Sequence, residues 1–131
     1  MNIPRMTDRM NIKIGEVVFT ISPVNYFVKK EIGEASKIVG GEQTFDLGLA
    51  QYIYIKHALK SVSGLIDSDG NEYRLSFEGD TLTDECISEL FYMEQREQFL
   101  TACWALLNEF SEKKVIQGVA LDLVRQVKPP L

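Results

Sequence analysis

The predicted fold is organised around residues 45–77, where a strongly apolar segment is followed by a turn and an alternating run. The first part of this stretch, residues 46–62, is apolar on nearly every side when drawn as a helix, and Asp46 is placed to cap it. A helix of this kind lies in the middle of a domain, because no face of it gains from contact with water. The apolar positions are Ala50, Tyr52, Ile53, Tyr54, Ile55, Ala58, Leu59 and Val62.

Nearer the start of the chain, apolar residues alternate with polar ones over residues 12–14 and 17–21. Gly15-Glu16 separates the two stretches, and Gly at the first position suits a two-residue turn that matches strand twist. We therefore predict an N-terminal β-hairpin. Residues 1–10 show no periodic apolar face, so we predict a flexible arm there and a single globular domain over residues 11–131.

A helical pattern follows the hairpin over residues 23–39. Ser22 is predicted as the N-cap and Pro23 as the first helical residue. Lys30 and Glu34 have the spacing of an i,i+4 ion pair on the polar face. We interpret Gly40-Gly41 as the stop of this helix.

The second half of the chain begins with the turn at residues 67–70 and an alternating run, predicted as a strand, over residues 72–77. Three more helices are predicted, over residues 83–91, 94–110 and 111–127. Thr83 is the N-cap of the first. The expected fold is therefore α+β and mainly helical, with about five helices, an N-terminal β-hairpin and one further short strand.

The composition is that of an ordinary globular protein, with 45% hydrophobic and 25% charged residues. The net charge of −5 arises in residues 41–93, which hold three basic and ten acidic residues. This acidic middle disfavours nucleic acid and anionic lipid as partners. No apolar run approaches the roughly 18 residues of a membrane span, and no apolar segment of a secretory signal follows Arg5 and Arg9. We expect a protein without nucleic-acid or membrane partners.

Candidate chemistry is sparse. Asp67-Ser68-Asp69-Gly70 resembles the start of a calcium loop, but Glu72 stands where such a loop needs Gly, so a plain turn is favoured. His57 is the only histidine and has no metal-type or triad-type partner one turn away, which favours a packed side chain. Cys86 and Cys103 are expected to be reduced, buried thiols. We expect no enzyme, no cofactor and no metal.

The last two predicted helices carry more apolar surface than the small hairpin needs. Core packing is one explanation for this stripe. A partner-binding surface is the other, because surplus apolar helix surface often marks an interface. The residues proposed for this surface are Trp104, Leu107, Phe110, Ile116, Val119, Leu123 and Val127.

The order of the short sequence motifs resembles that of the tail assembly chaperones of long-tailed bacteriophages. In that family a short N-terminal segment leads into a helix, like residues 13–23 here. A hydrophobic helix then ends in a Ser-Trp-Ser-Gly-like turn and an Asp-x-Asp-Gly stretch, like residues 60–70, and a Leu-Thr-Asp start follows, like residues 82–85. Val62 stands where the family commonly has an aromatic residue. The resemblance covers roughly residues 11–110.

The resemblance implies a non-enzymatic chaperone that works in the cytoplasm of the infected host and is absent from the mature virion. Its implied partners are the tape-measure protein, tail-tube subunits and further copies of itself. The alternative is a structural virion component such as a head–tail connector. These are expectations from the resemblance, and the residues alone are compatible with both.

Overall fold

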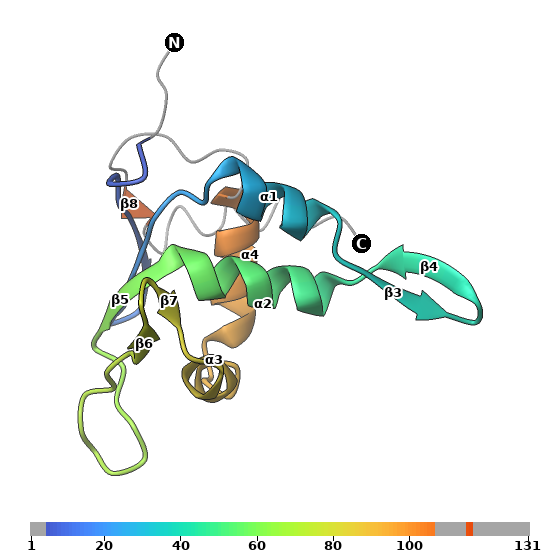
Figure 1. The fold of residues 1–131 in the computed structure, drawn as a ribbon. Coiled ribbons are helices and arrows are strands. Elements are labelled where there is room, and N and C mark those ends of the chain that lie inside the picture. Colours follow the sequence, from blue (N-terminus) through green and yellow to red (C-terminus); the bar gives the residue numbers. More distant parts are fainter. Residues whose placement is uncertain (1–4, 107–114, 117–131) are drawn as a thin grey trace.

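The computed structural model describes residues 5–106 and 115–116. These residues form four helices and eight short strands (Figure 1). The helices are α1 (Tyr26–Gly33), α2 (Leu47–Ala58), α3 (Asp84–Leu90) and α4 (Arg96–Leu106). The strands are β1 (Met10–Ile14), β2 (Val17–Ile21), β3 (Ser36–Val39), β4 (Glu42–Phe45), β5 (Leu59–Ser63), β6 (Phe77–Glu78), β7 (Thr81–Leu82) and β8 (Val115–Ile116).

The predicted N-terminal hairpin is confirmed. β1 and β2 pair antiparallel, with Ile14 opposite Val17 across the two-residue turn, and Gly15 has a positive φ of 59°. The hairpin is part of a four-stranded sheet of order β5-β2-β1-β8. Met10, which the sequence placed in the flexible arm, is the first residue of β1 and is 1% exposed.

The central helix is also confirmed, but it is shorter than predicted. The Asp46 side chain accepts a hydrogen bond from the main-chain N–H of Leu49 at 3.1 Å, and the helix ends at Ala58 rather than at residue 62. The following residues form β5, which pairs antiparallel with β2. A strand replaces the last helical turn because β2 presents an unpaired edge beside it, and pairing satisfies the main-chain groups of both segments.

The predicted helix over residues 23–39 is wrong in its second half. Asn25, not Ser22, caps α1, and the helix ends at Gly33. Residues 36–45 form a separate two-stranded hairpin, β3–β4, with Gly40-Gly41 as its turn. Both glycines have positive φ, 60° and 84°, which is the conformation of a two-residue hairpin turn that favours Gly-Gly. The Lys30–Glu34 ion pair forms at 3.9 Å on the exposed face of α1.

The second half of the chain contains fewer regular elements than predicted. The strand expected over residues 72–77 is reduced to β6, which pairs with β7, and to an isolated bridge between Ile66 and Glu72. Thr83 caps α3 as predicted, accepting a hydrogen bond from Cys86 N–H at 3.2 Å. The helix predicted over residues 94–110 corresponds to α4, which begins at Arg96.

The helix predicted over residues 111–127 is contradicted at β8, where Val115–Ile116 pairs parallel with Asn11 and Ile12 of β1. The remainder of that prediction lies outside the described residues. The fold is α+β, but it has four helices rather than about five in the described ranges, and it is not mainly helical. β3 and β5 occupy the ends of two predicted helices, and β8 lies within a third.

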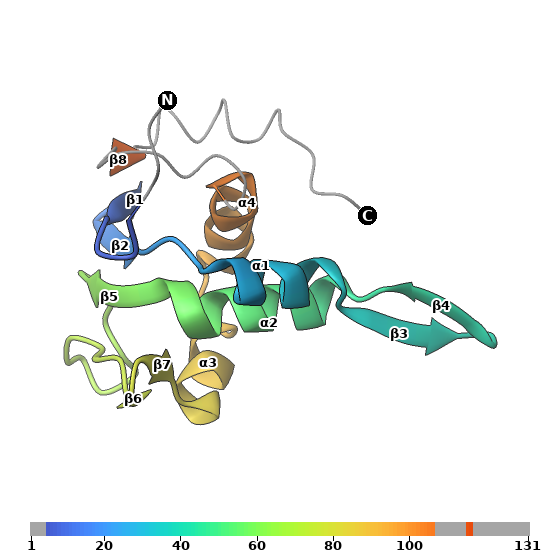
Figure 2. The ribbon, with the colours of Figure 1, turned by 45° about the horizontal axis from the view of Figure 1, so that its top comes forward.

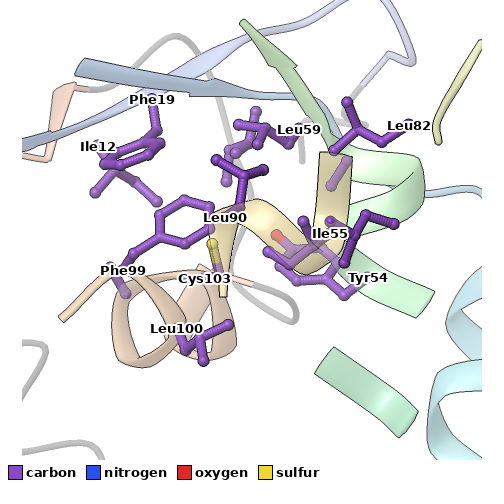
Figure 3. Close-up of a cluster of buried hydrophobic side chains, with 14 of the residues drawn as sticks. Ile12, Phe19, Tyr54, Ile55, Leu59, Leu82, Leu90, Phe99, Leu100 and Cys103 are labelled. Atoms are coloured by element: carbon purple, nitrogen blue, oxygen red, sulfur yellow. The ribbon is translucent and has the colours of Figure 1, made fainter. Parts of the chain in front are cut away.

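The hydrophobic core lies where the sheet, α2, α3 and α4 meet (Figure 3). The rings of Phe19 on β2 and Phe99 on α4 are 4.3 Å apart between centroids. Tyr54 and Ile55 of α2 point toward this cluster. Cys86 and Cys103 are free and buried, as predicted.

Candidate functional site

Of the residues predicted to bind a partner, Trp104 is the one whose side chain the structure places. It lies on α4, is half-buried, and packs against the core. Its ring meets the ring of Phe45 edge-on, with centroids 6.0 Å apart and an interplanar angle of 61°. Trp104 therefore joins α4 to the end of β4, and core packing is sufficient to explain it.

The other predicted residues are not assembled into a described surface. Ile116 lies in β8, where its backbone is opposite Ile12 of β1. The remaining five lie outside the described residues; they are Leu107, Phe110, Val119, Leu123 and Val127.

The most prominent exposed feature is the β3–β4 hairpin, which we call the ribbon (residues 36–45). Figures 1 and 2 show that it projects beyond the ends of α1 and α2, away from the main sheet. Ile38 and Val39 are 77% and 55% exposed, and they lie on opposite faces because successive strand residues alternate. In the described part of the chain, β3 and β4 pair only with each other. The ribbon thus offers apolar side chains and open main-chain edges together.

The base of the ribbon is firmly attached. The Asp46 N–H donates to the Ala35 carbonyl at 3.0 Å, which closes the segment just where it leaves α1 and enters α2. Gln43 donates from its side-chain amide to the Ser36 hydroxyl at 2.7 Å across the two strands. Phe45, the last residue of β4, is held by Trp104. The ribbon is therefore anchored at one end and exposed along its length.

The ribbon was not predicted because Gly40-Gly41 has two interpretations. The predicted helix stop is one of them. The same pair between β-branched residues is a signal for a hairpin turn, and Ile38, Val39 and Thr44 supply those residues. The signal was present, but the helical spacing of the preceding residues obscured it.

A second exposed apolar group lies at the start of α1. Tyr26 and Phe27 are 70% and 78% exposed, and their rings pack edge-on with centroids 5.6 Å apart. They turn outward because Val28 and Ile32 form the buried face of the helix. These two aromatic rings are contact surface that the predicted site did not include.

The polar candidates behave as turn and packing residues. In the Asp67 turn, the carboxylate accepts from the N–H groups of Asp69 and Asn71 at 2.9 and 3.0 Å, which is the geometry of a side-chain-stabilised turn. Among the residues that the structure describes, no group of three or more acidic, Cys or His side chains is arranged to hold a metal. The two hydrogen bonds to the Asp67 carboxylate confirm the predicted turn at residues 67–70.

His57 lies in the last turn of α2 and is partly buried. Its pKa is lowered, first by burial and then by the charges of Lys56 and Lys60, against an opposing effect of Glu31. A neutral ring at neutral pH follows from this environment. The ring nitrogens make no hydrogen bond to another described side chain, so no acid–base pair is formed here.

A polar cluster links α2 to α3 on the surface. The Tyr52 hydroxyl donates to the Asp84 carboxylate, and the Lys56 ammonium lies 3.3 Å from that hydroxyl and 4.0 Å from the carboxylate. The hydrogen bond to Tyr52 is the main cause of the raised pKa of Lys56. A lysine held protonated in this way is a poor nucleophile, and the cluster acts as a tie between two helices.

Comparison of this chain with protein-family models, with curated proteins and with solved structures finds no match in any of the three. Among the described residues, no helix is long and apolar enough to cross a membrane.

Proposed function

We propose that this protein is a non-enzymatic tail assembly chaperone of a long-tailed bacteriophage, which binds the tape-measure protein and tail-tube subunits and associates with itself. The observation that carries the proposal is the projecting ribbon with exposed Ile38 and Val39. The choice of phage tail partners comes from the resemblance of residues 13–23, 60–70 and 82–85 to that family.

The ribbon suits the binding of an extended or helical apolar segment. An isolated two-stranded hairpin is only marginally stable in water, so a partner that covers its faces or extends its edges stabilises it. Strand addition satisfies open N–H and C=O groups, and Ile38 and Val39 add apolar contact on each face. A long, poorly soluble polypeptide such as a tape-measure protein supplies segments of this chemistry.

Tyr26 and Phe27 offer a second contact surface, on α1. Two separate apolar surfaces allow one copy to hold a client and a neighbouring copy at the same time. We assign the ribbon to the tape-measure protein, and the α1 aromatic pair to self-association or to the tail-tube subunit. The negative net charge of −5 helps to keep such an assembly soluble.

Co-expression with the tape-measure protein of the same phage tests this function. The expected result is a larger soluble fraction of the tape-measure protein with the wild-type chain than without it. Ile38→Ser and Val39→Ser together should abolish most of that gain. Ile66→Ser is the matched control, because Ile66 is 58% exposed but lies in the loop after β5. An equally insoluble tape-measure protein with and without the chain contradicts the proposal.

The place of action in the host cytoplasm belongs to the same proposal. Mass spectrometry of purified virions should find the tape-measure protein but not this chain. A fixed copy number per particle would instead support the alternative, a structural virion component such as a head–tail connector.

A further inference from the structure

A cavity of about 600 Å³ lies where the N-terminal segment, the β2–α1 connection, the end of α2 and the β6–β7 turn meet. It is separate from the ribbon, which leaves the molecule at the opposite end of α2 (Figure 2). Its volume is within the range of about 300–1,000 Å³ typical of small-molecule sites. The lining combines charged and apolar side chains.

Two cationic side chains and one histidine, from different elements, line this cavity. Arg9 lies just before β1, His57 in the last turn of α2, and Lys60 in β5. In the described part of the chain, none of the three is within 4.0 Å of a carboxylate oxygen. Arg9 and Lys60 are positively charged, and His57 is neutral at neutral pH. Asp80 is the one carboxylate among the described residues of the lining. The lining therefore carries a net positive charge in a protein of net charge −5.

The hydrogen bonds of these side chains leave donors free for a ligand. One terminal nitrogen of Arg9 donates to the carbonyls of Met6 and Asp8, at 2.9 and 2.7 Å. Its Nε and its other terminal nitrogen have no partner among the described residues, and together they form the fork that binds an oxyanion in a bidentate way. Lys60 uses one of its three donors on the Asp80 carbonyl, at 3.0 Å.

The electrostatics of the cavity also favour an anion. Burial lowers the pKa of Lys60, and the charge of Arg9 lowers it further, while Asp80 opposes both. Lys60 in turn contributes to the lowered pKa of His57, which Glu31 opposes. A bound anion relieves this repulsion between like charges. The N-terminal end of α1, which lines the cavity at Asn25, adds a favourable dipole.

The cavity lining also includes apolar side chains. Val28 of α1 and Phe77 of β6 are two of them, and Phe77 is 41% exposed. A free inorganic ion would leave these apolar side chains in contact with water. An anion that carries an apolar or aromatic group covers them.

We propose that this cavity binds a small organic anion, whose carboxylate or phosphate group is held by Arg9 and Lys60 and whose apolar part lies against Phe77 and Val28. This site is independent of the proposed chaperone function, since neither Ile38 nor Val39 lines the cavity.

The test is an NMR titration of the ¹⁵N-labelled full chain with phenyl phosphate and with benzoate, and with benzyl alcohol as the uncharged comparison. Saturable shifts of the amides near Lys60, Asp80 and Arg9 are expected with at least one anion, and the stronger of the two identifies the anionic group. Benzyl alcohol should bind at least about tenfold more weakly, since charge-assisted hydrogen bonds supply most of the affinity.

Lys60→Gln and Arg9→Gln should each weaken binding of the anion at least about tenfold. Lys37→Gln removes the same charge from the exposed ribbon and should change the affinity less than about twofold. The amide spectrum shows directly whether each variant remains folded. Because two variants are used, the test does not depend on either one folding. The proposal is overturned if neither anion gives saturable shifts, if benzyl alcohol binds equally well, or if both folded variants retain wild-type affinity.

Discussion

Two of the β-hairpins in the described part of the chain, β1–β2 and β3–β4, are of similar length but have opposite environments. β1–β2 buries three of five residues on each strand in the core, whereas the ribbon β3–β4 has no buried residue. Both are closed by two-residue turns that begin with Gly. The local turn chemistry is therefore shared, and the difference lies in what covers the strands. The first hairpin stabilises the fold, and the second is free to contact a partner.

The largest expected change in the free energy of unfolding comes from a substitution in the buried hairpin, β1–β2. Phe19→Ala should lower the free energy of unfolding by about 3–5 kcal/mol, because it removes a fully buried ring that packs on Phe99. Ile38→Ala should change it by less than about 0.5 kcal/mol, because the side chain is mostly in water. Chemical denaturation of both variants measures the contrast, and equal losses would show that the ribbon is part of the core.

Substitution of one glycine near each hairpin turn should also destabilise the protein by different amounts. Gly64 has φ +81°, and a Cβ there would lie 2.3 Å from the Glu16 carbonyl oxygen in the turn of β1–β2. Gly64→Ala should therefore cost at least about 3 kcal/mol. Gly41 has a similar φ of +84°, but a Cβ added there would have no atom within 4 Å. Gly41→Ala should therefore lower the free energy of unfolding by only about 1–2 kcal/mol. Thermal unfolding monitored by circular dichroism compares them, and equal costs would rule out the steric contribution at Gly64.

Substitution of Asp46, at the base of the ribbon, should have a smaller effect on the free energy of unfolding. Asp46→Ala removes the cap of α2 and should cost about 1 kcal/mol in chemical denaturation. Asp46→Asn keeps an oxygen that can accept from the Leu49 N–H, so it should cost much less. If the two variants were equally destabilised, the carboxylate charge rather than the cap would be responsible.

The smallest effect is a pH dependence from His57. Its pKa in the folded protein is lowered, so below pH 6.5 the unfolded chain binds the proton more strongly and the folded state loses stability. Well above pH 6.5 the ring is neutral in both states and contributes no pH dependence. Comparing unfolding of the wild type and of His57→Gln between pH 8 and pH 5 isolates this contribution. If the free energy of unfolding of the wild type fell no more steeply with decreasing pH than that of the variant, the result would contradict this contribution of His57.

The sequence predicted the elements whose signals are local. The β1–β2 register follows from alternation and from Gly15, and the caps at Asp46 and Thr83 follow from side chains that bond to N–H groups three residues on. The α2–β5 boundary could not be predicted in this way. Leu59 and Val62 continue the helical pattern, and only the long-range pairing with β2 makes them a strand. The ribbon was missed for the same reason, since a helical spacing and a hairpin signal overlap there.

The candidate site was predicted least well. The residues chosen from the C-terminal stripe contained Trp104, which packs on Phe45, and five residues outside the described ranges. Amphipathic spacing does not distinguish a core face from a binding face, because both need the same apolar residues. Ile38 fits the apolar spacing of the helix predicted over residues 23–39, so its exposure was not predicted. The cavity of Arg9, His57 and Lys60 joins residues far apart in the sequence, which spacing alone does not reveal.

The hydrogen bond between Asp46 N–H and the Ala35 carbonyl has a further consequence. It brings the two ends of residues 36–45 together, so the path of the chain enters and leaves the ribbon at nearly the same point. An insertion with this geometry can change in length or be replaced while α1 and α2 keep their packing. A short peptide grafted in place of residues 37–44, with Phe45 kept against Trp104, would therefore be displayed at the far end of the molecule.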